Sequence, residues 1–324
     1  MLGFPSIVAN EVKRWFLPVR ALSRCVLVIG VLVVAGACST RASQTQPTSA
    51  NSPPAAPPAA ATDKDSKASA EGDSLPAGID LGKLDAFKRK VFDQVVNREP
   101  SVCGKGHSLL HSVKHDSSCR ASFYAVRYVA RLADAGSSES EIGEKLSHRF
   151  RDPHVPYIDV SQAPSKGSSS GRVAIVEFAD YECRHCKEAQ TVMQPLLAKY
   201  ASDVTLYFKH FPITSKNALN AALGATGAQN QGKFWQFSDK VWENWDHLTP
   251  ALLEGLAKEI GLDFSRWYAD VGSEEVRGHV QRDRTEARSL EIHRTPGIFV
   301  NGRRYTDEID FPSLKDWIDE ELGR

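Results

Sequence analysis

The feature that most constrains the fold of this chain is an apolar run that leads directly into two cysteines, Cys183 and Cys186. The segment 172–186 reads RVAIVEFADYECRHC, and apolar residues at helical spacing follow it. This pattern predicts a buried strand, a short turn and a helix that starts at Cys183. At a helix start, backbone N–H groups and the helix dipole favour a cysteine thiolate, which is the form that attacks disulfides.

The rest of the C-terminal half also alternates between strand and helix patterns. Further strands are predicted at 204–211, 297–300 and 303–306, helices at 183–200 and 311–322, and a long helical stretch at 215–290. Asn301 and Gly302 favour a type I′ turn between the last two strands. The pattern predicts an α/β fold in which the strands frame a group of inserted helices.

Residues 171–322 resemble the DsbA-like branch of the thioredoxin superfamily, a family of exported thiol–disulfide oxidoreductases. The matching features, in chain order, are Glu177, the pair Cys183 and Cys186 with His185 before the second cysteine, the run QGKFW at 231–235, and Thr295-Pro296 ahead of a strand. The resemblance implies a thioredoxin-like fold with a helical insertion over 171–324. It also implies that Glu177 is a buried acid beneath the dithiol and that Pro296 is a cis-proline.

The resemblance further implies how the two cysteines share the chemistry. Cys183 would react with the substrate, and Cys186 would resolve the mixed disulfide. Thr295 and Pro296 would bind the substrate chain. The redox group would be the Cys183–Cys186 disulfide itself, and no separate cofactor or metal ion is expected.

The residues around the cysteines are expected to set the acidity of Cys183. Arg184 and a partly protonated His185 favour its thiolate, whereas an ionised Glu177 opposes it. Because a stabilised thiolate makes the disulfide more oxidising, a disulfide-forming oxidase is the first interpretation. Arg184 replaces the proline of many family oxidases and Thr295 also occurs in isomerases, so a disulfide isomerase or reductase stays open. A non-catalytic envelope module that binds metal through the CxxC pair is the other alternative.

The N-terminus has the character of an export signal. Basic residues precede a short apolar stretch that ends at Ala37, which is typical of a signal peptide over residues 1–37. The sequence AGAC at 35–38 resembles a lipobox and predicts lipidation of Cys38. It also fits the site of ordinary signal peptidase, which would leave Cys38 unmodified. Residues 38–78, rich in alanine, serine and proline, predict a disordered tether.

These features place the expected protein in the cell envelope, on the periplasmic side, held at a membrane by a lipid anchor. The 40 basic and 40 acidic residues cancel, so the composition suggests no nucleic-acid partner. The resemblance implies that the partners are unfolded or reduced exported proteins and a membrane redox partner.

Residues 79–155 predict a small all-α module ahead of the α/β domain. Apolar residues that recur at helical spacing near its start are Leu81, Leu84, Phe87, Val91 and Val95. The Gly/Ser-rich segment 166–171 is expected to be part of a hinge between this module and the next domain.

The module carries a second pair of cysteines, Cys103 and Cys119, which are expected to form a structural disulfide in an oxidising compartment. A second redox pair, which relays electrons to or from the CxxC dithiol, is the sharper alternative. A zinc site that gathers both cysteine pairs is a further one. His107, His111 and His115 repeat every four residues, so on a helix they would line one face, either solvated or metal-binding.

Overall fold

The computed structural model describes residues 74–152 and 154–323, all of which belong to one compact unit, Lys67–Arg324. The predicted signal peptide, Cys38 and almost all of the predicted tether lie outside the described residues. Within the described ranges, no helix combines the length and the apolar character that crossing a bilayer requires.

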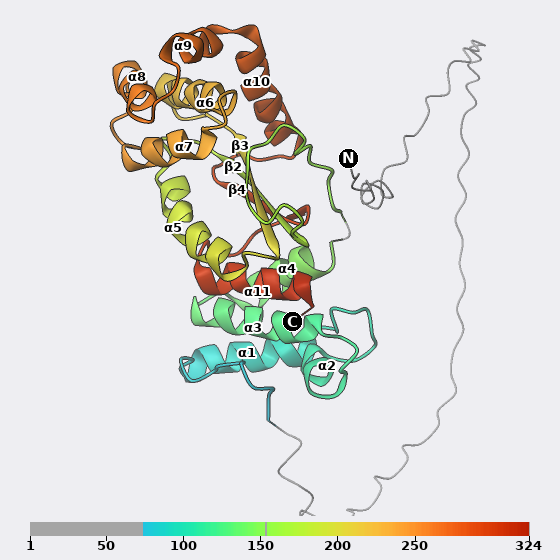
Figure 1. Ribbon diagram of the computed structural model, residues 1–324. Coiled ribbons are helices and arrows are strands. Elements are labelled where there is room, and N and C mark those ends of the chain that lie inside the picture. Colours follow the sequence, from blue (N-terminus) through green and yellow to red (C-terminus); the bar gives the residue numbers. More distant parts are fainter. Residues whose placement is uncertain (1–73, 153, 324) are drawn as a thin grey trace, which may run out of the picture. The chain divides into compact units, whose positions relative to one another are not determined.

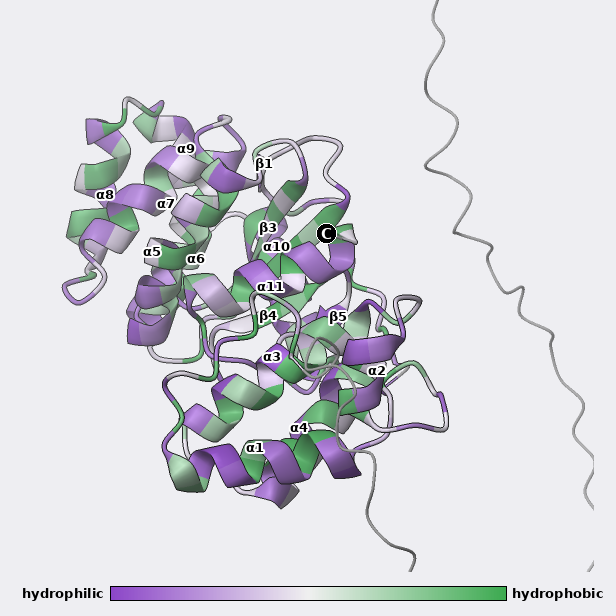
Figure 2. Cartoon of the chain, turned by 90° about the horizontal axis from the view of Figure 1, so that it is seen from below, coloured by the Kyte–Doolittle hydropathy of each residue, from purple (hydrophilic) through white to green (hydrophobic). Residues whose placement is uncertain are grey.

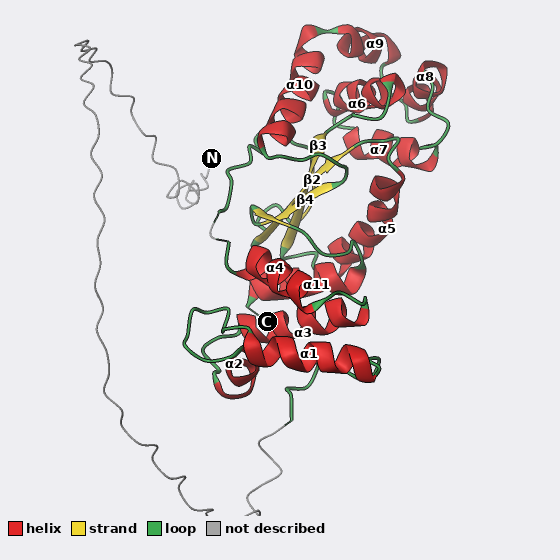
Figure 3. Ribbon diagram, turned by 180° about the vertical axis from the view of Figure 1, so that it is seen from behind, coloured by secondary structure: helices red, strands yellow, loops and turns green. Residues whose placement is uncertain are grey.

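A mixed sheet with the strand order β1-β3-β2-β4-β5 forms the centre of the described part of the chain (Figures 1 and 3). Its strands are β1 (Ser165–Gly167), β2 (Val173–Ala179), β3 (Val204–His210), β4 (Gly297–Val300) and β5 (Arg303–Arg304). The central strand, β2, pairs in parallel with β3 and antiparallel with β4. Its near-continuous apolar sequence suits a strand that is covered on both faces.

Helices cover both faces of this sheet. Helix α5 (Arg184–Lys199) follows β2, and together with α11 (Phe311–Leu322) it packs on one face through Leu196, Leu314 and Trp317. The insertion between β3 and β4 contains α6 (Lys216–Gln229), α7 (Phe234–Glu243), α8 (Pro250–Glu259), α9 (Phe264–Gly272) and α10 (Glu274–Ser289). This architecture confirms the predicted thioredoxin-like fold with a helical insertion.

The helical module precedes the sheet and consists of α1 (Ala86–Arg98), α2 (Leu109–His115), α3 (Ala121–Asp134) and α4 (Glu139–Phe150). A capping box starts α4, in which Ser138 and Glu141 satisfy each other's backbone N–H groups. Figure 2 shows hydrophobic and hydrophilic residues alternating around α1, as expected of a helix that buries one face. That face contributes Phe92, Val95 and Val96 to the module's own core.

Two local predictions were wrong. The helical spacing was predicted from Leu81 onwards, but α1 starts only at Ala86, so Leu81 and Leu84 precede the helix, and Phe87 in its first turn is 76% exposed. The predicted hinge at 166–171 also contains structure, since Ser165–Gly167 pairs with β3 as the edge strand β1. At Gly167, with φ of 100°, a Cβ atom would lie 2.6 Å from the carbonyl oxygen of Val204, so glycine is required for this close approach.

The module packs directly against α11 of the thioredoxin-like part through α3 (Figure 1). Charged residues fill this contact. Arg149, which has no exposed side-chain surface, pairs with Asp307 at 2.7 Å and with Glu320 at 3.1 Å. Arg127 of α3 also pairs with Asp316 of α11, at 3.0 Å. The two parts are therefore joined by a buried ionic cluster as well as by the chain.

Candidate active site

The first residue of the candidate site, Cys183, is the N-cap of α5 and is half-buried. The turn before it is fixed by Asp180, whose carbonyl oxygen accepts the Cys183 N–H at 3.0 Å. The buried Asp180 carboxylate accepts the N–H of Glu182 at 2.8 Å. It also accepts the N–H groups of Ile213 and Thr214, each at 2.7 Å, so it ties the turn to the loop that leads into α6.

The loop before β4 meets Cys183 from a position far along the chain. The Thr295–Pro296 peptide bond is cis. The Cys183 Sγ lies 3.3 Å from the Thr295 carbonyl oxygen. The fold thus brings the cysteine and the Thr295-Pro296 pair into contact. Both cysteines of the CxxC pair are free thiols, and Cys186 is buried.

Hydrogen bonds make the two thiols very different in acidity. The pKa of Cys183 falls to about 5, chiefly because the Cys186 thiol donates a hydrogen bond to its sulfur. The side chain of Thr295 and the backbone N–H groups of Cys186 and His185 lower it further, while partial burial opposes them. Burial raises the pKa of Cys186 well above its ordinary value. At neutral pH the pair therefore holds one thiolate, on Cys183, and one thiol, on Cys186.

Glu177 is completely buried on β2, as the resemblance implied. The Gln190 amide of α5 donates to both of its carboxylate oxygens at 3.1 Å. Burial raises the pKa of Glu177 to about 7, and the nearby Cys183 thiolate adds to the increase. Glu177 is therefore poised to take up or release a proton near neutrality.

The side chains of Arg184 and His185 lie differently from the expectation. They are 76% and 75% exposed, and both contact Glu188, Arg184 through Nε at 2.8 Å and His185 through Nδ1 at 3.2 Å. The charge of Arg184 is thus paired with a carboxylate in solvent, where ion pairs have little energy. The contribution of His185 to the acidity of Cys183 comes through its backbone N–H.

Three further residues of the site, Asp180, Gln190 and Glu188, were not predicted from the sequence. Gln190 follows Cys186 by four residues, so helical spacing alone placed both on one face of α5. Asp180 is a polar residue at the end of an apolar strand, directly before the CxxC turn. Such a position is a signal for a buried, hydrogen-bonded carboxylate.

The cysteines of the helical module, Cys103 and Cys119, form a disulfide with a Cα–Cα distance of 5.9 Å. They are thus bonded to each other and not gathered with the CxxC pair around a metal. His107 precedes α2, so the three histidines do not share one helix, and their rings are tilted against one another at centroid distances of 4.7 and 4.9 Å. Within the described residues, no three histidine, cysteine or acidic side chains are placed so that they could hold a metal ion.

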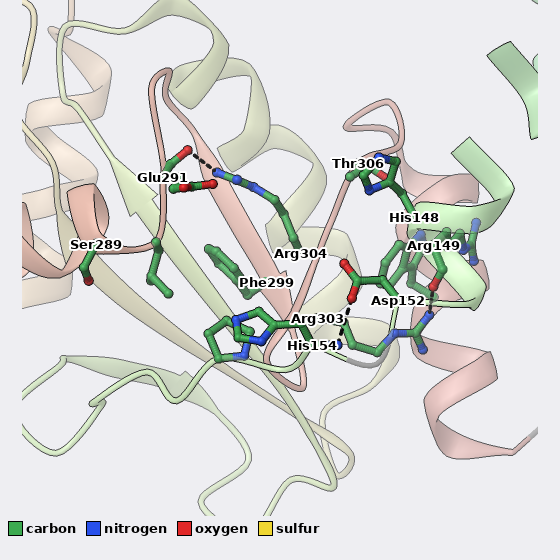
Figure 4. A pocket seen from close by; sticks show the side chains of 13 residues that line it. His148, Arg149, Asp152, His154, Ser289, Glu291, Phe299, Arg303, Arg304 and Thr306 are labelled. Carbon is green, nitrogen blue, oxygen red and sulfur yellow. Dashed lines mark hydrogen bonds between the residues drawn. The ribbon is translucent and has the colours of Figure 1, made fainter. Parts of the chain in front are cut away.

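A pocket of about 450 Å³ lies apart from the dithiol, beside the linker that follows α4 (Figure 4). Arg303, Arg304 and Phe299 from β4 and β5 line it. Its charged groups are engaged with backbone oxygens, because Arg304 donates to the Glu291 carbonyl at 3.1 Å and Arg303 to the Arg149 carbonyl at 2.8 Å. None of the dithiol residues lines this pocket.

The fold and the site together define a class, the thioredoxin-fold proteins with a redox-capable CxxC at a helix start. A family model described as Thioredoxin matches residues 160–320. A probable disulfide bond formation protein D of Bacillus anthracis is 34% identical over 178 residues, which are 51% of this chain and 80% of that protein. The chain belongs to the DsbA-like family of thioredoxin-fold thiol–disulfide oxidoreductases.

The same region of the chain is similar to proteins that have other names and lengths. The Na(+)/H(+) antiporter NhaA 3 of Salinispora tropica is 33% identical over 190 residues, which are 58% of this chain but only 28% of the antiporter. The chain thus spans little more than a quarter of that relative's length. The crystal structure of oxidised BdbD from Bacillus subtilis is 26% identical and covers 51% of this chain and 96% of its own, with a TM-score of 0.48.

Proposed function

We propose that this chain forms disulfides in other proteins and that its CxxC dithiol acts as the oxidant. The observation that carries the proposal is the acidity of Cys183, whose pKa is about 5 at the start of α5. The donors that lower this pKa stabilise the reduced thiolate form. A pair whose reduced form is stabilised gives up its disulfide readily, and so oxidises other thiols.

The reaction begins with the oxidised Cys183–Cys186 pair and a substrate thiolate. The thiolate attacks Cys183 Sγ, a mixed disulfide forms, and the bond to Cys186 breaks with its electron pair on the Cys186 sulfur. That sulfur takes a proton, because burial disfavours its thiolate. Glu177, with its pKa of about 7, supplies this proton. A second substrate thiolate then attacks the substrate sulfur of the mixed disulfide, and Cys183 leaves as its stable thiolate.

The net change moves two electrons from two substrate thiols to the dithiol, so no cofactor beyond the cysteines is needed. The pair must then be reoxidised, and we assign this step to a membrane redox partner. We further propose that the substrates are unfolded or reduced exported proteins and that residues 1–37 direct export. Cys38 would carry a lipid that holds the protein at a membrane on the periplasmic side.

The central experiment equilibrates the mature protein with glutathione buffers and measures the fraction of oxidised Cys183–Cys186. We expect a potential near that of the strong oxidants of the family, about −120 mV. A value near that of thioredoxin, about −270 mV, would contradict the oxidase and support the reductase alternative. The Cys186→Ala variant, with Cys183 first converted to a mixed disulfide by oxidised glutathione, should exchange that glutathione for a reduced substrate protein and hold it as a mixed disulfide, whereas Cys183→Ser treated in the same way should hold none.

The anchor has its own test. Mass spectrometry of the mature N-terminus should find diacylglycerol on Cys38. An unmodified Cys38 would refute the anchor and leave the redox proposal untouched, because soluble enzyme can be assayed in the same glutathione buffers.

A further inference from the structure

The disulfide of the helical module joins two cysteines that differ in exposure, unlike a disulfide that is buried as a whole. Cys103 is exposed, in the glycine-containing loop before α2, whereas Cys119 is buried just before α3. The CxxC end of α5 packs against the helical insertion, whereas the module packs against α11 (Figure 1). Cys103 is therefore the member of this second pair that other molecules can approach.

A chain of buried hydroxyl groups leads away from the Cys119 sulfur. Ser122 Oγ lies 2.9 Å from Cys119 Sγ, and Ser101 Oγ lies 3.8 Å from it on another side. Ser101 Oγ is 2.9 Å from Ser112 Oγ, which in turn is 3.2 Å from Nε2 of His107. The three serines are between 0% and 3% exposed. The network thus runs from a buried sulfur to a half-buried imidazole.

Charged groups surround the imidazole end of this network. Asp116 Oδ2 lies 3.7 Å from His107 Nε2, and Lys105 Nζ holds the same carboxylate at 2.7 Å. The ring of His111 is tilted against the ring of His107, with their centroids 4.7 Å apart. His107 therefore contacts both an acid and solvent at the outer end of the serine chain.

We propose that Cys103–Cys119 is a second redox-active disulfide, with Cys103 as the attacked sulfur and Cys119 as the leaving group. An external thiolate attacks Cys103 Sγ, a mixed disulfide forms, and the bond to Cys119 breaks with its electron pair on Cys119 Sγ. Ser122 donates a hydrogen bond to that thiolate, and a proton reaches it from His107 through the serine chain. A second external thiolate releases Cys103, so that one external dithiol becomes a disulfide and the pair becomes two thiols.

The leaving sulfur has the features that speed this exchange. Disulfide exchange is faster when the departing thiolate is stabilised. Hydrogen bonds to charged groups are about twice as strong as those between neutral groups, and Cys119 has a buried hydroxyl at 2.9 Å. Cys119 also lies next to Arg120, the N-cap of α3, and so is near the helix end whose dipole favours negative charge. A disulfide with a purely structural role requires neither a proton path nor an exposed cysteine.

The experiment uses the mature chain with Cys183→Ser and Cys186→Ser, so that its outcome is independent of the dithiol proposal. Dithiothreitol is added under native conditions, and the reduction of Cys103–Cys119 is followed by alkylation and mass spectrometry. We expect reduction much faster than global unfolding. Ser122→Ala should slow it roughly tenfold, through loss of one hydrogen bond to a charged sulfur. Ser147→Ala, at an exposed serine of α4, is the matched control and should react at the parent rate.

A second variant keeps the test decisive if Ser122→Ala does not fold. His107→Gln lies at a half-buried position, and it should slow the reduction, because the serine chain then lacks its proton donor. The proposal is overturned if the bond is reduced only as fast as the protein unfolds. It is equally overturned if folded Ser122→Ala reacts like Ser147→Ala, or if His107→Gln is reduced at the parent rate.

Discussion

At the residue scale, the acidity of Cys183 depends on hydrogen-bond donors more than on neighbouring cations. The Cys186 thiol makes the largest contribution to lowering the pKa, and Arg184 is engaged with Glu188 in solvent. Short-range donors act inside a partly buried site, whereas exposed charges are screened by water and salt. The resemblance located the reacting sulfur, but it could not show which groups surround it.

This difference gives a first prediction. In Cys186→Ala the pKa of Cys183 should rise clearly above about 5, because the first donor to its sulfur is lost. Arg184→Ala, the control, should shift it by no more than a few tenths of a unit. The rate of iodoacetamide alkylation as a function of pH measures both pKa values. A larger shift in Arg184→Ala than in Cys186→Ala would contradict the structure.

The second prediction concerns the buried acid. Burial raises the pKa of Glu177 from 4.5 to about 7, so the folded protein binds this proton more tightly than the unfolded chain. The associated stability is complete below the ordinary pKa and is lost as pH rises through about 7. A shift of this size corresponds to roughly 3 kcal/mol. Relative to the parent, Glu177→Gln should therefore gain stability between pH 5 and pH 9 by up to that amount.

Urea unfolding of the reduced proteins at both pH values gives the required free energies. Glu188→Gln is the control, because Glu188 is exposed on α5. It should show no comparable gain. A Glu177→Gln variant whose stability runs parallel to the parent over this pH range would show that Glu177 ionises as it does in the unfolded chain.

At the element scale, two glycines of α6 lie where large aromatic side chains of the insertion pack against this helix. A Cβ atom on Gly224 would lie 3.0 Å from Cζ of Phe237 and 3.2 Å from Cζ2 of Trp267. The Trp267 indole also donates to the Gly224 carbonyl oxygen at 2.8 Å. Gly227 faces the same indole at 3.2 Å. The close approach of α9 to α6 therefore requires small residues.

We therefore expect Gly224→Ala to destabilise the protein by about 1–3 kcal/mol, as overpacking of a filled core does. Gly255 is the matched control, since it lies within α8 and a Cβ atom there would meet nothing within 4 Å. Gly255→Ala should raise stability by about 0.5–1 kcal/mol, because alanine is the better helix former. Thermal unfolding of the two variants would decide, and equal effects of the same sign would be inconsistent with this packing.

The elements that could be predicted from the sequence are those with a strong local pattern. The run before Cys183, the helix after it and the turn at Asn301-Gly302 all carry their own periodicity or turn chemistry, and Asn301 and Gly302 both have positive φ. The edge strand at Ser165–Gly167 has no such pattern. It exists because β3 offers it an edge, and a long-range pairing of this kind leaves little trace in three residues.

At the scale of the whole molecule, the buried ionic cluster couples the helical module to the thioredoxin-like part. Arg149 has no exposed side-chain surface and lies against the rings of Tyr128 and Trp317, with guanidinium-to-centroid distances of 4.8 and 4.6 Å. Its charge is balanced by Asp307 and Glu320 from the other part of the molecule. Removing one partner of such a cluster leaves buried charge uncompensated.

Arg149→Ala should therefore destabilise the protein by about 3–5 kcal/mol. The control is Arg98→Ala, because Arg98 forms an exposed pair with Glu139 and its loss should cost at most about 1 kcal/mol. Urea unfolding followed by circular dichroism and by tryptophan fluorescence measures both. The parent should unfold in one transition, and similar small losses in both variants would argue against a tightly coupled interface.

In the candidate site, too, short motifs could be recognised from the sequence, whereas contacts that form only in the folded chain could not. The dithiol, Glu177 and Thr295-Pro296 were recognised through family motifs, because each motif is short and contiguous. The partners of these residues were not recognised, because Gln190 contacts Glu177 only once α5 packs on β2. The serine chain beside Cys119 is similar, since residues from three separate segments meet only in the folded module.

The hydrogen bonds of the Asp180 carboxylate couple the helical insertion to the turn before Cys183. It holds the backbone of Ile213 and Thr214, just before the first inserted helix, to the turn that carries the reactive sulfur. If the inserted helices move away from the dithiol, either these two hydrogen bonds to the buried Asp180 carboxylate break, or the turn moves with the helices. Movement of the backbone at residues 213 and 214 is therefore coupled to movement of the turn before Cys183.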